Sequence, residues 1–400
     1  MKYDFETVRK RYGMGSGKWD ELQAAKPDAG EDTIPFSVAD MEFVQAPEIV
    51  DGLKAFLDKS VLGYANATPA FKESVCRWMR DRHGWNAQPE WILPSHGVVD
   101  AFYAAIRCFS KEGDGVMLLT PVYYPMYMAI SSNNRKLVDC PLVRNGSTYD
   151  IDFDDFEKKA SDPNTKLFLL CSPHNPCGRV WTKEELQKMA DICCRYNVLV
   201  IDDEIHHDLI MPGYEHFVYA ALSREAEQNC LVLTAPSKTF NLAGLQTSNI
   251  FVPNEKLREQ FLTFMKRSSA NPKCNILGYE ACRIAYDHCG SWLDQCISVI
   301  HENKERITSY FSRHFPQIQV CELQATYLLW MDWNGLGLPY KELERINRQE
   351  AELFFDEGYI FGAQGEGFER WNLACPTQYI DAALERMNRA YSKYINDSAL

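Results

Sequence analysis

The stretch that decides the fold is residues 231–244, which read Leu-Val-Leu-Thr-Ala-Pro-Ser-Lys-Thr-Phe-Asn-Leu-Ala-Gly. An apolar run typical of a buried strand ends in Ala-Pro-Ser, and Lys238 follows at once. Burying an ammonium group is costly unless the group is paired or loses its charge. A lysine that loses its charge is a nucleophilic amine that can form a Schiff base with an aldehyde. A surface lysine after a strand is the alternative, and this segment alone leaves both interpretations open.

Composition limits what the 400-residue chain can be. It is 46% hydrophobic and 24% charged, which is ordinary for a globular protein with a large and a small domain. The formal net charge of -13 argues against nucleic acid or an anionic membrane as the main partner. A locally positive pocket for a small anion remains compatible with that charge.

The sequence predicts a cytoplasmic protein. The first residues contain no apolar core of a signal peptide, and no run of about 18 apolar residues predicts a membrane span. The 14 cysteines are scattered and form no CxxC pair, so we expect reduced thiols. Cys282, Cys289 and Cys296 recur every seven residues, and we attribute this spacing to one packed helix face rather than to a metal site.

Strands and helices alternate along most of the chain. Helices are expected at 71–83, from about 97 to 109, and at 183–195. The apolar strand candidates are 116–119, 137–143, 167–171, 198–201, 231–233 and 249–252. Apolar runs without alternation, separated by helices, predict an α/β fold whose mixed, mostly parallel sheet is covered on both faces.

An N-terminal arm and two domains are predicted from this pattern. Residues 1–50 read as an arm that packs with the small domain, 51–290 as the large domain, and 291–400 as a smaller α+β domain. A long helical region is expected from 274 to about 314, and the segments 325–332, 340–357 and 380–394 supply the small domain.

The ends of the parallel strands carry the polar side chains. Ligands of such sheets collect at the carboxyl ends of the strands. Strand 116–119 is followed by Tyr123 and Tyr124, and strand 167–171 is followed by Asn175. Strand 198–201 is followed by Asp203, and strand 231–233 is followed by Ser237 and Lys238. We therefore expect an aromatic pair, an amide, an acid and a lysine at one edge of the sheet.

One ligand, pyridoxal phosphate, would use this whole set. It needs an amine for its aldehyde, an acid for its ring nitrogen, an aromatic ring to stack on, and donors for its phenolic oxygen and phosphate. The amine would be Lys238 and the acid Asp203. The stacking ring would be Tyr123, and the donor to the phenolic oxygen would be Asn175. Ser237 and the amides of Gly97, Val98 and Val99, where a helix begins, could hold the phosphate.

The ordered motifs resemble the aspartate-aminotransferase-like, fold type I enzymes of aminotransferase class I/II. More narrowly, the chain is similar to the carbon–sulfur β-lyases of the cystathionine β-lyase and cystalysin type. The motifs that carry this similarity span almost the whole chain: Lys18-Trp19-Asp20, 37–43, Gly63-Tyr64, 120–125, Ser172-Pro173-His174-Asn175-Pro176, Asp203-Glu204-Ile205-His206, 211–216, 237–244 and 354–362.

The resemblance implies further roles. Arg370 would clamp the substrate carboxylate, with the backbone near Ala39 and the amide of Asn175 lining that site. Tyr64 would reach the partner subunit's cofactor phosphate and substrate, which implies a homodimer with shared active sites. Tyr123 or Tyr124 would assist Lys238 in proton transfer.

Two departures favour a lyase over an aminotransferase. His206 stands where many aminotransferases have a tyrosine, as in the lyases, and also contributes to the cofactor site. Gln246 stands in the region where they often have an arginine for the phosphate. We therefore expect α,β-elimination of L-cystathionine, L-cysteine or cysteine S-conjugates to a thiol, pyruvate and ammonia.

Three alternatives stay open at this stage. An aminotransferase on the same fold is the nearest, and a regulatory protein that binds a partner and has secondary lyase activity is another. The acids and histidines of 202–207 could instead suggest a metal site, but no HExxH motif or matching distant Cys/His pair accompanies them, so none is predicted.

Overall fold

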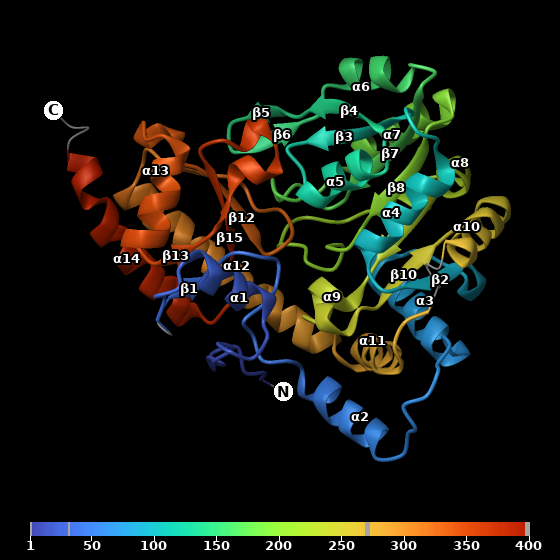
Figure 1. The fold of residues 1–400 in the computed structure, drawn as a ribbon, viewed down its shortest axis with the longest axis horizontal. Helices are drawn as coiled ribbons and strands as arrows, with labels where there is room; N and C mark the ends of the chain where they lie inside the picture. The colour runs from blue at the N-terminus through green and yellow to red at the C-terminus, as the bar shows by residue number, and fades with distance from the viewer. Residues whose placement is uncertain (1, 31–32, 269–272, 397–400) are drawn as a thin grey trace.

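The computed structural model describes residues 2–30, 33–268 and 273–396. Within them, a seven-stranded sheet has the order β2-β10-β9-β8-β7-β3-β4 (Figure 1). Its strands are β2 (Ile92–Ser95), β3 (Gly115–Thr120), β4 (Lys136–Pro141), β7 (Thr165–Cys171), β8 (Leu199–Asp203), β9 (Cys230–Thr234) and β10 (Ser248–Phe251). Neighbouring strands from β9 to β4 are parallel, whereas β10 is antiparallel to both β9 and β2. This mixed, mostly parallel sheet confirms the predicted fold class.

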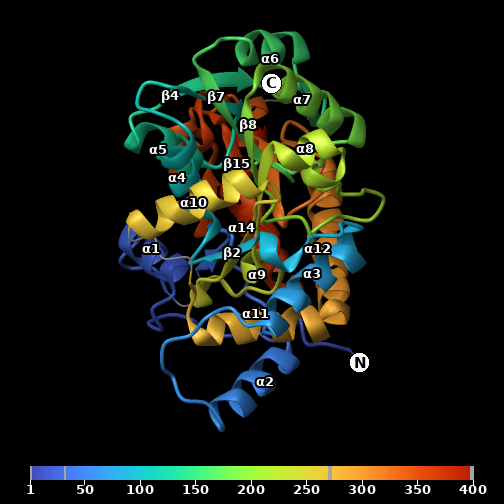
Figure 2. The same cartoon turned by 90° about the vertical axis from the view of Figure 1, so that its right-hand side faces the viewer.

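Both faces of the sheet are buried. Consecutive side chains of β3 alternate between two core clusters, with Met117 in one and Leu118 in the other, and neither is exposed. Helices α4, α5 and α10 lie on one side of the sheet and α7 and α8 on the other (Figure 2). The helices of this part are α3 (Pro69–His83), α4 (Val98–Phe109), α5 (Tyr124–Ser132), α6 (Phe153–Ala160), α7 (Lys183–Tyr196), α8 (Arg224–Gln228), α9 (Pro236–Thr239), α10 (Glu255–Arg267) and α11 (Ile276–His288).

Local sequence signals set the helix ends. Thr182 and Glu185 form a reciprocal capping box at the start of α7, which satisfies two otherwise unpaired amides. Thr68 caps α3 in the same way at one amide, and Gly84 ends that helix in the left-handed region at φ 64°. The helices predicted at 71–83, 97–109 and 183–195 are present, and side-chain caps set the starts of the first and the last.

A second, smaller sheet lies beside the first (Figure 1). In the described residues it contains four antiparallel strands in the order β11-β12-β15-β14. Its strands are β11 (Gln319–Val320), β12 (Leu328–Asp332), β14 (Asp356–Glu357) and β15 (Phe368–Asn372), and its helices are α12 (Gly290–His314), α13 (Tyr340–Arg345) and α14 (Thr377–Asn396).

The N-terminal arm joins this smaller part. The arm contains helix α1 (Gly17–Ala25) and strand β1 (Ile34–Pro35). Helix α2 (Pro47–Leu57) begins at the end of the arm. Strand β1 pairs in parallel with β13 (Leu353–Phe354). This separate two-stranded sheet, together with the hydrogen bond from the Asn372 amide of β15 to the Phe36 carbonyl, ties the arm to the C-terminal part of the chain.

Four details differ from the sequence expectations. Strand β2 was not predicted; it extends the sheet at the antiparallel edge. Residues 137–143 divide between β4 and β5 (Val143–Asn145), which pairs with β6 (Thr148–Asp150). Residues 340–357 are a short helix, a π-helical turn and two short strands.

The fourth difference concerns the region from 274 to 314, which is two helices rather than one. Helix α11 ends at His288 and α12 begins at Gly290, a residue that disfavours a helix interior. The predicted single helix face through Cys282, Cys289 and Cys296 is therefore wrong, although all three thiols are buried in one core cluster.

In the described part of the chain, no helix combines the length and apolar character needed to cross a bilayer.

Candidate active site

Lys238 lies where the sequence places it, at the carboxyl end of β9. Pro236 opens the short helix α9 there, a position that needs no backbone N–H. The Lys238 Nζ atom donates to the Ala39 carbonyl at 2.8 Å, and no described carboxylate forms an ion pair with it. Burial lowers the pKa of Lys238 to about 8, so about a tenth of this amine is neutral and nucleophilic at pH 7, far more than for an ordinary lysine.

Asp203 ends the adjacent strand β8. The strand register places Asp203 opposite Cys171 of β7 and Leu233 of β9, so these strands end together. Its Oδ1 atom accepts from the Ile205 amide at 3.1 Å, and burial raises the pKa of the carboxyl to about 7. A cation placed against this carboxyl would favour its ionised form.

A cavity of about 200 Å³, here called the inner cavity, lies between these two groups. Its wall includes Ala39, His96, Gly97, Val98, Val99, Tyr123, Asn175, Asp203, His206, Ser237 and Lys238. Helix α4 begins at Val98, and its N-cap Gly97 offers no side-chain cap. The first amides of a helix lack intrahelical partners, so this end of the inner cavity suits an anion.

Tyr123 and Asn175 close the inner cavity from the β3 and β7 side. The Tyr123 amide donates to the Asn175 carbonyl at 3.0 Å, which links the two loops. Tyr123 is largely buried, and burial raises the pKa of its phenol, so the ring is neutral. The flat ring and the amide therefore occupy fixed positions beside Lys238.

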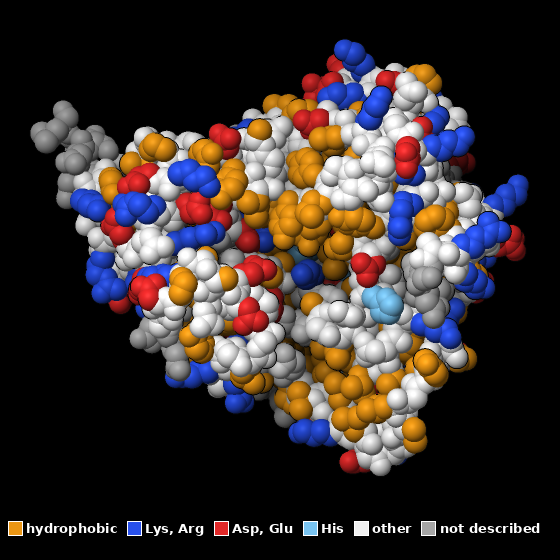
Figure 3. Space-filling view, viewed as in Figure 1, with side chains coloured by type: hydrophobic (Ala, Val, Ile, Leu, Met, Phe, Trp, Pro, Cys, Tyr) orange, Lys and Arg blue, Asp and Glu red, His pale blue; other side chains and the backbone are white. Residues whose placement is uncertain are grey.

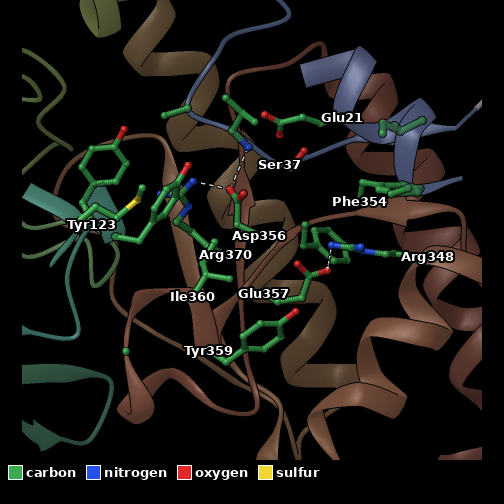
Figure 4. A pocket seen from close by; sticks show the side chains of 18 of the residues that line it. Glu21, Ser37, Tyr123, Arg348, Phe354, Asp356, Glu357, Tyr359, Ile360 and Arg370 are labelled. Carbon is green, nitrogen blue, oxygen red and sulfur yellow. Dashed lines mark hydrogen bonds and ion pairs between the residues drawn. The ribbon is translucent and has the colours of Figure 1, made fainter. Parts of the chain in front are cut away.

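Arg370, on β15 of the smaller sheet, faces the same region. Its Nη1 atom donates to Asn175 Oδ1 at 2.8 Å, and Nη2 forms an ion pair with Asp356 (Figure 4). The buried Nε atom has no partner, and the guanidinium lies 4.6 Å from the Phe361 ring centroid. Arg370 thus links strand β15 of the smaller sheet to the loop after β7, and Asp356 occupies one of its terminal nitrogens.

The N-terminal arm covers the lysine. Asn241, three residues after Lys238, pairs with both backbone atoms of Met41, at 3.0 Å to its amide and 2.9 Å to its carbonyl. Asn372, two residues after Arg370, donates to the carbonyls of Val38 and Asp40, each at 2.7 Å. Two asparagines from different domains thereby fix Ala39 above the lysine.

A larger cavity of about 650 Å³, here called the outer cavity, opens beyond Lys238 and Arg370. Its wall includes Glu21, Tyr124, Tyr127, Met128, Phe354, Phe355, Tyr359 and Ile360 (Figure 4). Hydrophobic side chains surround this hollow on the face shown in Figure 3. Lys238, Ala39 and Tyr123 line both cavities, so the lysine stands at their junction.

His206 and Tyr124 are further predicted site residues, and Gln246 marks a departure from the aminotransferases rather than a predicted site residue. His206 is buried in the inner cavity wall, its Nδ1 atom has no partner, and burial lowers its pKa, which keeps the ring neutral. Tyr124 lines the outer cavity with 41% of its surface exposed. Gln246 is exposed and lines neither cavity.

Tyr64 is the one predicted site residue that the single chain leaves outside. It is fully exposed, in a segment without regular structure after α2, and lines neither cavity. Figures 1 and 2 both show α2 and the following segment projecting from the body of the chain.

A sequence profile of the aminotransferase class I and II family matches residues 31–387. The chain belongs to this family. It is 37% identical over 390 residues to cystathionine β-lyase PatB of Bacillus subtilis, covering 97% of this chain and 100% of that one. It is 30% identical to the protein MalY of Escherichia coli, covering 95% and 96% of the two chains.

A solved structure extends this similarity to three dimensions. Cystalysin from Treponema denticola, whose structure contains a pyridoxal 5'-phosphate cofactor, superposes with a TM-score of 0.96. It is 46% identical and covers 98% of this chain and all of its own. The resemblance expected from the motifs is therefore confirmed at the level of family and fold.

Two contributors to this family site were missed by the sequence reasoning. Asp356 holds Arg370 and also accepts the Val38 amide at 2.9 Å. His96 lines the inner cavity just before the start of α4. The sequence around Asp356 or His96 contains no pattern that predicts a site residue, because only the fold brings these two side chains to the site.

Proposed function

We propose that this protein is a pyridoxal-phosphate-dependent carbon–sulfur β-lyase. The observation that carries the proposal is the half-buried Lys238, which has no described ion-pair partner and shares one small cavity with the buried acid Asp203 and the uncapped start of α4. The relatives named cystathionine β-lyase and the structure of cystalysin support the same activity.

The residues of the inner cavity fit the cofactor. Lys238 would bond its aldehyde and Asp203 would hold the ring nitrogen, since the described hydrogen bonds to that carboxylate leave one oxygen for it. Tyr123 would stack on the ring and Asn175 would hold the phenolic oxygen. Ser237 and the amides of Gly97, Val98 and Val99 would hold the phosphate.

When bound, this cofactor accepts electron density from the substrate Cα, which allows a thiolate to leave from Cβ. The chain's own residues then place and move the protons. Lys238, with a pKa of about 8, is suited to accept the Cα proton as a general base. Tyr123 and Tyr124 stand next to it, and either phenol can protonate the leaving thiolate.

Arg370 would bind the substrate carboxylate as a planar, bidentate partner. Asp356 must then give up its contact with Nη2, while Asn175 keeps Nη1 in place. The backbone at Ala39 would line this carboxylate site from the arm. The outer cavity, about 650 Å³ and largely apolar, leaves room for the thiol-side group of cystathionine or a bulkier S-conjugate.

We further propose that the protein acts as a homodimer. Val61 and Leu62 are 88% and 62% exposed next to the fully exposed Tyr64, and a second subunit would bury such an apolar segment. Tyr64 would then reach the partner's inner cavity. The 14 free cysteines support a reducing compartment such as the cytoplasm.

The activity is tested by pyruvate release. The holoenzyme is incubated with L-cystathionine, L-cysteine and a set of S-substituted cysteines, with no keto acid added. A lyase releases a thiol and pyruvate in equal amounts. Turnover that requires an added keto acid would instead identify an aminotransferase.

The shared active site is tested by mixing subunits. Tyr64→Ala and Lys238→Ala homodimers are each expected to be impaired. Mixed dimers contain one site with both native residues, so activity should return after subunit exchange. Failure of exchanged dimers to regain activity would reject the role of Tyr64 in the partner's site.

A further inference from the structure

A cluster of histidines and acids lies outside both cavities of the active site. It consists of His83, the last residue of α3, with His207 and Asp208 from the turn after β8. One ligand atom from each residue lies within 4.8 Å of the others. No matching partner for the acids and histidines after β8 is visible in the sequence, but the fold brings His83 to them.

The geometry suits a metal ion. His83 Nε2 lies 2.7 Å from Asp208 Oδ1, and His207 Nε2 lies 3.1 Å from Asp208 Oδ2. The two imidazole centroids are 4.3 Å apart. Ligand atoms at about 2.1 Å from a tetrahedral zinc ion lie roughly 3.4 Å from each other, so small outward movements of these side chains would admit the ion.

His207 points to a missing ligand. The ring is completely buried; its Nε2 atom faces Asp208 Oδ2 at 3.1 Å without hydrogen-bond geometry, and its Nδ1 atom has no hydrogen-bond partner. Buried polar atoms without partners are costly and rare, and an unoccupied ion site is one cause. On the other side of the His207 ring, Glu204 Oε2 lies 4.0 Å from His207 Nδ1 and 3.3 Å from His216 Nε2. None of these three atoms makes a hydrogen bond, although the two distances are within ion-pair range.

The surroundings hold the carboxylate as metal sites do. Trp78 Nε1 donates to Asp208 Oδ1 at 3.0 Å, and Thr239 Oγ1 donates to Asp208 Oδ2 at 2.8 Å. Such outer partners fix the orientation of a ligating group. A surface hollow of about 720 Å³ reaches His83, His207 and His216 and provides an entry path that shares no lining residue with the inner cavity.

We propose that His83, His207 and Asp208 bind one divalent transition-metal ion of the zinc type, with His216 or Glu204 available as a further ligand. Two imidazoles and a carboxylate select zinc, cobalt or nickel over magnesium or calcium, which prefer oxygen ligands. The ion would join the end of α3 to the turn after β8. Through Asp208 and Thr239 it would also stabilise the turn that carries Lys238.

The experiment measures zinc bound to the holoenzyme. Protein stripped with a chelator is dialysed against zinc and then against metal-free buffer, and zinc per chain is determined by elemental analysis. Wild type is compared with His83→Gln and His207→Gln, and with His288→Gln, which changes an exposed histidine at the end of α11. Zinc-soaked crystals of wild type locate the ion by anomalous scattering.

Wild type and H288Q should each retain about one zinc ion per chain more than H83Q and H207Q. Added zinc should raise the Tm of wild type and H288Q but not that of H83Q or H207Q. The anomalous peak should lie within bonding distance of both His83 and His207. Equal zinc in H83Q and wild type, which would place the ion on cysteine thiols, would overturn the proposal, as would no retained zinc. If H207Q does not fold, H83Q and the wild-type crystal decide.

Discussion

Two lysines contact neighbouring backbone carbonyls of the N-terminal arm, Lys18 from within the arm and Lys238 from the large sheet, and their environments are opposite. Lys18 is 2% exposed, forms an ion pair with Glu42 at 3.1 Å, and donates to the Asp40 carbonyl. Lys238 contacts the neighbouring Ala39 carbonyl but has no described ion-pair partner. A buried amine that is paired with a carboxylate keeps its charge, whereas burial without such a partner lowers the pKa of the amine and favours its reactive, neutral form.

Arg370 is intermediate between them. It is buried and paired with Asp356, as Lys18 is with Glu42, but its pair lies on the wall of the outer cavity. A substrate carboxylate can therefore replace Asp356, whereas nothing of that kind reaches Lys18. The three cations show that access to a cavity, not burial, separates a structural charge from a functional one.

Replacing the unpaired lysine is expected to have the largest effect. Lys238→Ala should lower kcat by about 10⁴-fold, because the general base and the point of attachment of the cofactor are both lost. The absorbance of the bound cofactor in the visible should disappear as well. Lys256→Ala, an exposed lysine on α10, is the control and should behave as wild type. Retention of absorbance and activity in K238A would remove Lys238 from the mechanism.

Replacing the paired lysine should affect stability instead. Lys18→Met leaves Glu42 buried with Arg11 as its remaining partner, and should lower the free energy of unfolding by roughly 3 kcal/mol. Urea titration measures this change. The exposed pair of Lys54 with Asp51 is the control, and Lys54→Met should cost no more than about 0.5 kcal/mol. A stable K18M protein with a large loss of kcat would mean that Lys18 is functional after all.

Arg370→Lys tests the intermediate case. A lysine cannot make the bidentate contact, so kcat/KM should fall by about 30-fold, equivalent to roughly 2 kcal/mol, mainly through KM. Steady-state kinetics over several thioethers measures the effect. An unchanged KM would place the carboxylate site elsewhere.

The smallest effect is a displaced pH midpoint. An amine attacks an aldehyde only when neutral, and burial lowers the pKa of Lys238 to about 8 from its ordinary 10.5. The rate at which the cofactor-free protein captures pyridoxal phosphate should therefore rise with pH below about 8 and level off above it. Stopped-flow absorbance follows this capture. A rate that still rises at pH 10 would show an ordinary, solvated lysine.

The sequence predicted the parts of the site that follow parallel strands. Asp203, Asn175, Tyr123 and Lys238 could be found because each comes directly after an apolar run, and parallel strands end at a common edge. Asp356, His96 and strand β2 were missed because their neighbours in space are distant in sequence. The predicted division into domains at residues 50 and 290 stays a prediction.

The sequence by itself determined the sheet, the family and the set of residues offered to a cofactor, because strand periodicity and motif order are local properties. Only the tertiary structure decided the charge state of each group. The sequence singles out Lys238 by its place after an apolar run, but only the fold shows that Glu42 pairs with Lys18 whereas no described carboxylate pairs with Lys238. Likewise, His83 acquires a possible function only where α3 ends beside His207 and Asp208. Desolvation and pairing depend on neighbours that the fold assembles, so no local pattern can encode them.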